Sequence, residues 1–361
     1  MRIGIDAHML GDKSGGNESF YAGILGSMNT NDGNEYILFV RRGVDIAKYI
    51  GKFQVVFFKS RNAAIRNFVE LSYLCIKYRL DVLHTQYYLP FIRPCKTVCT
   101  IHDISYEHYK NIFNRSEYFR NKLLIPYAAC RADKVITVSD FCKKDISATY
   151  RIPESKIEVI YNAVDPEFRV LTDDELQCVN VRDTYGIGNE QYLLCVGNLQ
   201  PRKNIPRLIR AFEMYKKKTG ANTKLVIVGK KAWLYKEILE ETSNNKDIIL
   251  TGYVPKCDLV ELLNEAKGFV YPSYFEGFGI PPLEALSCGT PVAVSDIDVM
   301  REVLGDVVIY FDPYDEKDIA SALKRLITED KTPQIKRIDI NTWGQSAEQL
   351  KKVYTKIDNG G

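Results

Sequence analysis

Short apolar runs alternate with amphipathic segments along the whole chain, a pattern typical of strands and helices in turn. Several runs are continuously apolar, as expected for parallel strands that are buried on both faces. In the first half the pattern predicts strands at Arg2–Asp6, Tyr36–Val40, Gln54–Phe58, Val82–His84, Thr97–Ile101, Val135–Val138 and Lys156–Asn162, and helices at Ser19–Met28, Ala64–Tyr78 and Tyr118–Arg131.

The second half repeats this alternation more clearly. Asn204 is expected to cap a helix that has Pro206 in its first turn and that Gly220 ends. We expect a turn between the strands that end at Ser295 and begin at Val307. The predicted strands are Tyr192–Val196, Lys224–Val228, Ile248–Thr251, Phe269–Tyr271, Val292–Ser295 and Val307–Phe311, and the helices are Trp233–Ser243, Asp258–Ala266, Pro282–Ser287, Lys317–Ile327 and Trp343–Ile357.

Repeated strand–helix units predict two doubly wound α/β domains with Rossmann-like parallel sheets. A polar, irregular stretch from Asp165 to about Asn189 is expected to connect them. We assign residues 1–165 to the first domain, together with a final helical segment at 343–361. Residues 166–342 form the second domain.

Composition narrows the class of protein further. The 361 residues are 45% hydrophobic and 26% charged, which excludes a disordered or collagen-like chain. No apolar run approaches the ~18 residues that a membrane-spanning helix needs, and the first residues do not resemble a secretion signal. Nine cysteines without a C-x-x-C pair predict reduced thiols in the core. We therefore expect a cytoplasmic protein.

Charge is distributed unevenly between the two halves. Residues 1–165 hold 23 Lys and Arg against 17 Asp and Glu, whereas residues 166–361 hold 26 against 29. No basic block or recognition motif points to nucleic acid. The excess of basic residues in the first half, near aromatic positions, leaves two interpretations: peripheral contact with an anionic membrane face, or an ordinary solvated surface. The residues behind the first interpretation are Arg115, Arg120 and Lys122 with Phe113, Tyr118 and Phe119.

Two predicted strands are followed by loops of interest: one loop contains a glycine pair, and the other contains a basic pair. No G-x-G-x-x-G follows the first strand, so a nicotinamide or flavin site loses its main support. Gly15 and Gly16 instead precede a helix, where backbone amides can approach an anion. Arg202 and Lys203 stand between a strand and a helix start, and two cations there suit a diphosphate. The alternatives are a purely structural turn at Gly15-Gly16 and a solvated basic pair at Arg202-Lys203.

The third and strongest pattern spans residues 271–285. Glu276 follows a strand, Gly277 and Gly279 open the backbone, and Glu284 lies in the first turns of the next helix. Two carboxylates so placed can accept hydrogen bonds from sugar or ribose hydroxyls while the loop amides meet a phosphate.

These segments together resemble the family 4 retaining glycosyltransferases, which have the GT-B fold of two Rossmann-like domains facing a cleft. The resemblance covers nearly the whole chain and looks most like bacterial mannosyltransferases that act on surface polysaccharides. Its carriers are Gly15-Gly16, Thr100-Ile101-His102-Asp103, Val138-Ser139, Asn162-Ala163-Val164-Asp165, Pro201-Arg202-Lys203-Asn204, Glu276 with Glu284 eight residues later, and Cys288-Gly289-Thr290-Pro291-Val292.

The resemblance implies roles for individual residues in binding the donor. Arg202 and Lys203 would grip the diphosphate, and Glu276 would hold hydroxyls of the transferred sugar. Glu284 would bind the ribose. Other donor contacts would come from backbone, as the resemblance implies, at Gly15 and Gly16, at Tyr253 and Val254 for the base, and at Gly277, Phe278 and Gly279 for the sugar and phosphate.

On the acceptor side the resemblance places His102 near the anomeric carbon, with Asp103 beside it. His102 and Glu276 are thus the expected catalytic residues. His84 also follows a strand, and the sequence leaves open whether it is a core residue or a site residue. His108 is expected at the surface. Asp296-Ile297-Asp298 mimics a D-x-D metal motif but is expected to be a loop, so we predict no metal.

The expected reaction is transfer of a hexose, with mannose from GDP-mannose favoured, to a hydroxyl of a glycan or lipid-linked acceptor. The anomeric configuration would be retained, no cofactor is expected, and the donor is a nucleotide-sugar co-substrate. The alternatives are a UDP-sugar donor (glucose, galactose or N-acetylglucosamine), a nucleotide-sugar epimerase on the same architecture, and an interaction protein on an inactivated scaffold.

Overall fold

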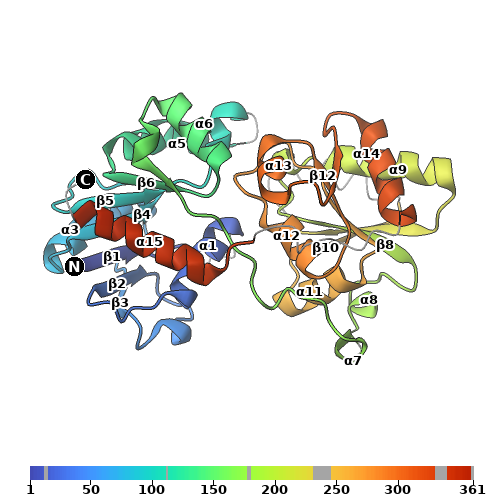
Figure 1. The fold of residues 1–361 in the computed structure, drawn as a ribbon. Helices are drawn as coiled ribbons and strands as arrows, with labels where there is room; N and C mark the ends of the chain where they lie inside the picture. The colour runs from blue at the N-terminus through green and yellow to red at the C-terminus, as the bar shows by residue number, and fades with distance from the viewer. Residues whose placement is uncertain (12–14, 111–112, 177–179, 231–244, 330–339, 359–361) are drawn as a thin grey trace. The chain divides into compact units, whose positions relative to one another are not determined.

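The fold consists of two compact α/β units (Figure 1). A computed structural model describes residues 1–361 except 12–14, 111–112, 177–179, 231–244, 330–339 and 359–361. Unit 1 comprises Met1–Ala163 and Asn341–Gly361, and unit 2 comprises Val164–Ile340. These boundaries differ by about two residues from those expected from the sequence.

Unit 1 is built on a seven-stranded sheet in the order β3-β2-β1-β4-β5-β6-β7, and every pairing between its strands is parallel. Its strands lie within a few residues of the predicted runs, because parallel strands covered on both faces need continuous apolar sequence. They are β1 (Arg2–Asp6), β2 (Glu35–Val40), β3 (Gln54–Phe57), β4 (Val82–Gln86), β5 (Lys96–Thr100), β6 (Lys134–Thr137) and β7 (Ile157–Val159).

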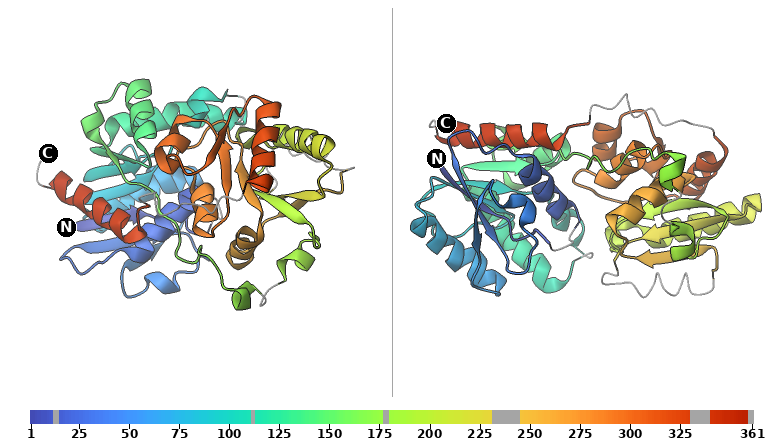
Figure 2. Two further views of the ribbon diagram at one scale, coloured as in Figure 1. Left: turned by 45° about the vertical axis from the view of Figure 1, so that its right-hand side comes forward. Right: turned by 90° about the horizontal axis from the view of Figure 1, so that it is seen from below.

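Helices cover both faces of this sheet (Figure 2). The predicted helix at Ala64–Tyr78 is a run of α2, a π-helical stretch and α3. Two α-helices, α4 and α6, and two single-turn helices, η1 and η4, were not predicted. One of these, α6, buries only Cys142 and Ile146, so its apolar signal is sparse. The helices are α1 (Gly16–Ser27), η1 (Ala47–Tyr49), α2 (Ala63–Ile65), η2 (Arg66–Glu70), α3 (Leu71–Lys77), α4 (Ser105–His108), α5 (Arg115–Arg131), α6 (Asp140–Tyr150) and η4 (Glu154–Lys156).

The final helix, α15 (Trp343–Asp358), belongs to unit 1 and packs along α1 (Figure 1). A Cβ at Gly23 of α1 would lie 2.2 Å from the Trp343 ring, so only glycine fits under that indole. Ser346 donates a hydrogen bond of 2.7 Å to the Tyr161 carbonyl oxygen. The last segment of the chain therefore completes the first domain.

Unit 2 has a six-stranded parallel sheet in the order β10-β9-β8-β11-β12-β13. Its core is formed by strand residues and by the apolar faces of α9 and α14, for example Phe212 and Leu323. Its strands are β8 (Gln191–Val196), β9 (Thr223–Val228), β10 (Ile248–Gly252), β11 (Gly268–Tyr271), β12 (Val292–Ser295) and β13 (Ile309–Phe311). Its helices are α7 (Asp173–Leu176), α8 (Val181–Thr184), η5 (Pro201–Lys203), α9 (Ile205–Thr219), α11 (Lys256–Glu265), α12 (Ile280–Ser287), α13 (Asp298–Leu304) and α14 (Glu316–Thr328).

Three local expectations for unit 2 meet different outcomes. The turn expected after Ser295 is wrong, because α13 lies there and buries Val299 and Met300. Asn204 precedes α9 but does not cap it with its side chain, which instead donates a hydrogen bond of 2.8 Å to the Pro313 carbonyl. The helix predicted at Trp233–Ser243 falls outside the described residues.

No helix in the described part of the chain is both long and apolar enough to span a bilayer.

Candidate functional site

Two cations and a carboxylate meet at the carboxyl end of the unit 2 sheet. Arg202 and Lys203 lie in η5, just after β8, and Glu276 lies in the loop after β11. The Glu276 Oε1 is 2.6 Å from the Lys203 Nζ and 2.7 Å from the Arg202 Nη1. Neighbouring strands β8 and β11 thus bring together residues separated by more than seventy positions. These three residues, which the sequence predicts to bind the donor, lie in one cluster.

This cluster is buried, and burial governs its electrostatics. Lys203 and Glu276 are 7% and 6% exposed. Burial lowers the pKa of Lys203 to about 8, against the pull of the Glu276 carboxylate. Burial acts to raise the pKa of Glu276, but the charges of Arg202 and Lys203 overcome it and hold that pKa at about 2. Both partners are therefore mainly charged at neutral pH.

Tyr271, at the end of β11, is a member of this cluster that the sequence did not single out. Lys203 donates a hydrogen bond of 2.5 Å to its hydroxyl, and the Lys203 Nζ also lies 4.5 Å from the centre of its ring. Arg202 is held in turn by the Phe275 carbonyl oxygen, 3.2 Å from its Nη1. The two cations are thus fixed by hydrogen bonds rather than spread into solvent.

The loop after Glu276 leads directly into α12. Gly279 has a φ of +90°, and a Cβ there would lie 2.3 Å from the Met300 Cε, so this position requires glycine. Pro281 and Pro282 follow in the first turn of the helix and carry no N–H. The sequence prediction that Gly277, Phe278 and Gly279 supply amides to a ligand stays a prediction.

Glu284, the second carboxylate, is partly exposed on α12. Its pKa is raised to about 8 by desolvation first and then by the Asp165 carboxylate, against the opposing charge of Lys256. Lys256 begins α11, directly after the segment that holds Tyr253 and Val254. The proposed ribose carboxylate and the proposed base-binding backbone therefore lie on the same side of unit 2.

Tyr253 and Val254 themselves differ in exposure. The Tyr253 side chain is 52% exposed, and the Lys230 Nζ lies 5.4 Å from the centre of its ring, whereas Val254 is buried.

A second set of predicted residues meets within unit 1. His102 follows β5, and its Nε2 lies 2.6 Å from the Nε2 of Gln86, the last residue of β4. The same Gln86 nitrogen is 3.4 Å from the carbonyl oxygen of Asn17, in the first turn of α1. The ring of Phe20 meets the His102 ring edge-on at 5.1 Å. His102 and the Gly15-Gly16 turn are therefore joined through Gln86, which the sequence did not single out.

The His102 imidazole is buried and neutral at physiological pH. Desolvation lowers its pKa to about 4, although the charge of Asp103 opposes that shift. Because the Gln86 amide donates to both Asn17 and His102, the His102 Nε2 accepts, which leaves the ring proton on Nδ1. The Gln86 Oε1 is buried and, among the described residues, has no hydrogen-bond partner.

The glycine pair has the open backbone that was expected of it. Gly15 has a φ of +81°, and its carbonyl oxygen accepts hydrogen bonds from the Glu18 and Ser19 amides at the start of α1. A Cβ at Gly15 or at Gly16 would meet no described atom within 4 Å. A ligand can therefore approach this backbone.

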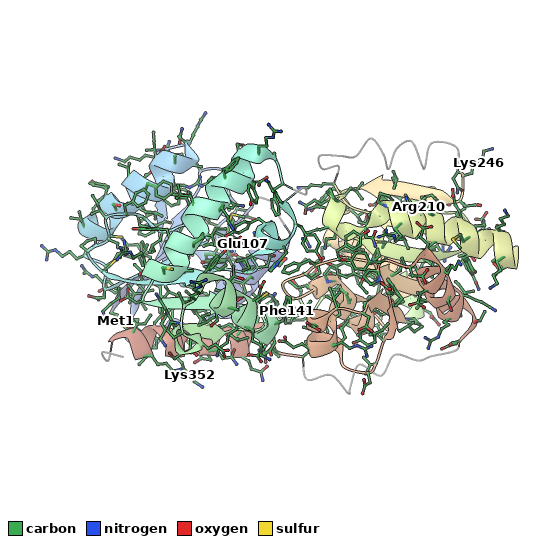
Figure 3. The ribbon with its side chains drawn as sticks, turned by 90° about the horizontal axis from the view of Figure 1, so that it is seen from above. Met1, Glu107, Phe141, Arg210, Lys246 and Lys352 are labelled. Atoms are coloured by element: carbon green, nitrogen blue, oxygen red, sulfur yellow. The ribbon has the colours of Figure 1, made fainter. Side chains whose placement is uncertain are left out.

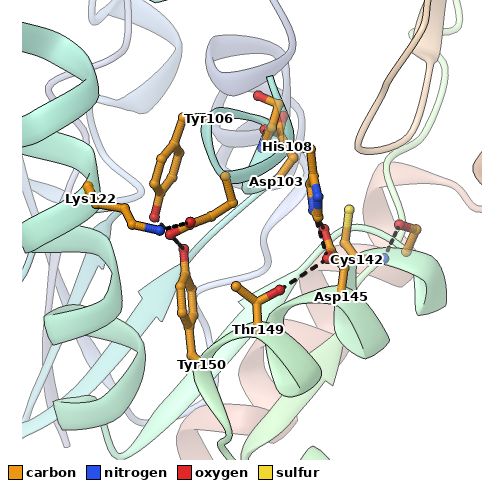
Figure 4. Close-up of polar contacts among 11 residues, drawn as sticks. Asp103, Tyr106, His108, Lys122, Cys142, Asp145, Thr149 and Tyr150 are labelled. Atoms are coloured by element: carbon orange, nitrogen blue, oxygen red, sulfur yellow. Dashed lines mark hydrogen bonds and ion pairs between the residues drawn. The ribbon is translucent and has the colours of Figure 1, made fainter. Parts of the chain in front are cut away.

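Asp103 starts a segment that is anchored at three points (Figure 4). Its Oδ1 accepts a hydrogen bond of 2.9 Å from the Ser105 amide at the start of α4. The three following side chains tie α4 to α5 and α6: Tyr106 bonds to Tyr150, Glu107 pairs with Lys122, and the His108 Nε2 lies 2.9 Å from Asp145. This anchoring holds the backbone that carries His102 and Asp103.

His84 and His108 have structural partners. His84 is fully buried and bridges the Tyr354 hydroxyl at 2.6 Å and the Thr100 hydroxyl at 2.7 Å, so it is a core residue. His108 is at the surface, as expected, with 41% of its side chain exposed.

Asp296 makes a two-pronged ion pair with Arg301, with both distances 2.7 Å, and Asp298 begins α13. The described residues hold no group of three acidic, histidine or cysteine side chains that could bind a metal ion.

Models of two protein families match the chain. The model described as glycosyl transferases group 1 matches residues 180–341, and the model described as glycosyltransferase family 4 matches residues 30–168. The two matches fall one in each unit.

Curated relatives include two enzymes of O-antigen assembly. The O-antigen chain mannosyltransferase B of Escherichia coli is 31% identical over 258 residues, which are 69% of this chain and 65% of the relative. The O-antigen chain mannosyltransferase RfbU of Salmonella typhimurium is 33% identical over 247 residues, 68% and 64% of the two chains. The matches thus span less than two thirds of these relatives.

Among solved structures, the sucrose-phosphate synthase of Thermosynechococcus elongatus superposes with a TM-score of 0.76 over the full length of both chains. At 17% identity, this similarity is one of fold.

Proposed function

Because the chain belongs to the glycosyltransferases of family 4 and group 1, we propose that it transfers a hexose from a nucleotide sugar to an acceptor hydroxyl. The observation that carries the proposal is the buried cluster of Arg202, Lys203 and Glu276. It combines fixed positive charge for a diphosphate with a carboxylate for sugar hydroxyls.

The cluster suits the step in which the donor is cleaved. The bond between the anomeric carbon and the diphosphate oxygen breaks, and negative charge grows on the leaving diphosphate. Arg202 and Lys203 would stabilise that charge as fixed donors at low dielectric. The acceptor oxygen forms the new bond on the same face, and its proton passes to a diphosphate oxygen. The anomeric configuration is thereby retained.

Glu276 would act on the transferred sugar as a hydrogen-bond acceptor. It is ionised because its two cationic neighbours hold its pKa at about 2. The proposed donor contacts in unit 2 also include Glu284 for the ribose and the backbone at Tyr253, Val254 and residues 277–279.

In unit 1, His102 and Asp103 would act on the acceptor side of the reaction, whereas the backbone at Gly15 and Gly16 would contact the donor. A neutral imidazole that carries its proton on Nδ1 can hydrogen-bond to a sugar or acceptor hydroxyl, and Gln86 sets that tautomer. The acceptor class that we propose is a glycan or a lipid-linked glycan, met at the inner face of a membrane.

Mannose from GDP-mannose is the donor that we propose. It is supported by the names of the two relatives, both mannosyltransferases of O-antigen chains. We propose a reaction without a bound metal or cofactor, in which Arg202 and Lys203 supply the positive charge that contacts the diphosphate.

Binding and slow hydrolysis of a nucleotide-sugar panel test this function. GDP-mannose, UDP-glucose, UDP-galactose and UDP-N-acetylglucosamine are compared by calorimetry and by release of free sugar without acceptor. We expect the tightest binding and the fastest release with GDP-mannose, and loss of both in Glu276→Ala. Conversion of a donor into an epimeric nucleotide sugar, or no binding of any donor, would contradict the proposal.

A further inference from the structure

Large apolar side chains are exposed unevenly over the molecule. Eight of the fourteen exposed large hydrophobic residues that the structure describes lie in three segments of unit 1, at residues 59–79, 91–96 and 115–131. We call these three segments the α3–α5 face. The eight residues are Ile65, Val69, Tyr73, Ile76, Phe91, Ile92, Phe119 and Leu123.

On the first segment these side chains form a stripe along a helical run. Ile65, Val69, Tyr73 and Ile76 follow one another at steps of four, four and three residues, so they share one side of α2, η2 and α3. Their exposed fractions are 50–62%. The opposite side buries Leu71, Leu74 and Cys75 in the core of unit 1. The stripe is therefore a second apolar side on a helix that already has a buried one.

Ring contacts join this run to α5 through the loop between β4 and β5. The Phe91 ring stacks on Phe68 at 5.0 Å and meets the Tyr127 ring of α5 at 5.2 Å. Arg93 donates hydrogen bonds of 3.1 Å to the Phe91 carbonyl and to the Tyr127 hydroxyl. The loop that exposes Phe91 and Ile92 is thus fixed between the two helical segments.

On α5 the exposed large apolar residues are Phe119 and Leu123. They lie one turn apart, and their exposed fractions are 64% and 72%. Glu107, labelled in Figure 3, lies in α4 and pairs with Lys122 of α5. Of the three aromatic residues that the sequence predicted at this surface, Phe119 is exposed. The other two, Phe113 and Tyr118, pack against the core of unit 1.

Positive charge is concentrated on the same three segments. They hold eleven of the 23 Lys and Arg of residues 1–165 but only two of the 17 acids, Glu70 and Glu117. Glu107 and Asp133 pair with Lys122 and Lys96 from outside the segments, which still leaves eleven basic residues against four acidic ones. The remainder of residues 1–165 is therefore slightly acidic, and the basic excess belongs to this face.

We propose that the α3–α5 face docks unit 1 on an anionic lipid bilayer. Helices that lie in the membrane interface combine Phe and Leu side chains with Lys and Arg, whose long stems reach the headgroups. Eleven basic residues against four acidic ones give the face a net positive charge, which complements anionic headgroups. Isolated large apolar side chains set among cations match a charged lipid surface better than a dry protein partner.

This inference deepens the proposed function and rests on it in one respect: a bilayer at this face would present a lipid-linked acceptor to the enzyme. Docking itself requires neither donor nor acceptor. It depends on apolar insertion and on attraction between basic residues and anionic headgroups, and the attraction weakens as salt screens it.

Cosedimentation of the full chain with vesicles tests the proposal. Vesicles of phosphatidylcholine with about one third phosphatidylglycerol are compared with pure phosphatidylcholine, at low and at high salt. We expect binding to the anionic vesicles at least about tenfold stronger than to the neutral ones, and a steep loss at high salt.

An acidic residue placed on the α3–α5 face tests whether this face binds the vesicles. Leu123→Asp on α5 and Val69→Asp on the first segment should each weaken vesicle binding about tenfold. The matched control is Ile50→Asp, since Ile50 is 66% exposed in the same unit but lies outside the face; it should change binding less than twofold. All three positions are exposed, so the fold should persist.

No binding to anionic vesicles at low salt overturns the proposal, as does equal loss in all three variants. Self-association that Leu123→Asp abolishes, without vesicle binding, would assign the face to a second copy of the chain and also overturn it. Donor binding and slow donor hydrolysis, measured in parallel without lipid, report the proposed function separately. Failure of one assay with success of the other therefore tells which proposal is wrong.

Discussion

The Lys203 Nζ lies 2.6 Å from the Glu276 Oε1, inside the carboxyl end of the unit 2 sheet. That one oxygen also holds the Arg202 guanidinium, so a single carboxylate positions both cations. A diphosphate bound there joins a cluster whose geometry Glu276 already sets. Changes at any of the three residues should therefore affect donor binding through the other two.

Lys203→Ala should weaken binding of GDP and UDP by ~2–3 kcal/mol, the range for charge-assisted hydrogen bonds. Because Lys203 is buried and ion-paired, the variant should also lose some stability, on the order of 1–3 kcal/mol. Calorimetric titration of the folded variant measures the first effect, and denaturant unfolding measures the second. Lys216→Ala is the control, since Lys216 pairs with Asp247 elsewhere in unit 2. Unchanged nucleotide affinity in Lys203→Ala would remove the assigned diphosphate site.

Glu284 should make donor binding depend on pH. Its pKa is raised to about 8, so it is largely protonated at pH 7 and becomes a full hydrogen-bond acceptor as the pH rises. The affinity of the wild type relative to Glu284→Gln should therefore increase most steeply near pH 8 and begin to level off about one pH unit higher. The ratio of the two affinities cancels the titration of Lys203. A ratio that stays flat between pH 6 and 9 would contradict a ribose contact from Glu284.

Activity should persist in excess chelator. The diphosphate charge is met by Arg202 and Lys203, and Asp296 of the D-x-D motif is already paired with Arg301. Turnover measured after treatment with EDTA should match the untreated enzyme. Activity that disappears with chelator and returns with Mn²⁺ would show that a metal site exists.

Acid should destabilise the protein through its buried histidines. Burial lowers the pKa of His84 to about 3 from a usual value of 6.5, so the unfolded chain binds a proton that the folded chain does not. The free energy of unfolding is therefore unaffected by titration of His84 above pH 6.5. As the pH falls from 6.5 toward 3, protonation of His84 in the unfolded chain lowers it by up to ~1.4 kcal/mol per pH unit.

His84→Gln keeps a side chain that can bond to Thr100 and Tyr354 but removes this titration. Urea unfolding of both proteins between pH 8 and 4 measures the difference. The two curves should run parallel above pH 7, and the wild type should fall more steeply below pH 6. Equal slopes over the whole range would show that His84 does not titrate in this way.

Much of the fold was predictable because its strands are buried on both faces. Continuous apolar runs such as Leu193–Val196 have no other stable place than the centre of a parallel sheet. The short helices were harder to predict. α6 buries only Cys142 and Ile146 along eleven residues, so its apolar pattern is sparse. α13 buries four residues but spans only seven, which is too short for a helical period to be distinguished from a turn.

In the candidate site, sequence motifs located the charged residues but not the residues that position them by hydrogen bonds. Arg202, Lys203 and Glu276 were identified from their places after strands. Tyr271 and Gln86 were missed because their roles arise from partners in loops or turns that follow other strands, 68 residues away for Tyr271 and 16 for Gln86. The sequence also left His84 undecided, since only the packing of α15 supplies its partner Tyr354.

The division of labour between donor and acceptor residues is tested most directly by measuring donor affinity and turnover separately in two variants. His102→Ala should cut turnover by ~10²-fold or more, as expected for a group at the reacting centre, and change donor affinity little. Glu276→Ala should reduce both, because that carboxylate holds the sugar and the two cations. A folded His102→Ala that loses donor binding as severely as Glu276→Ala would place His102 in the donor site and contradict the account.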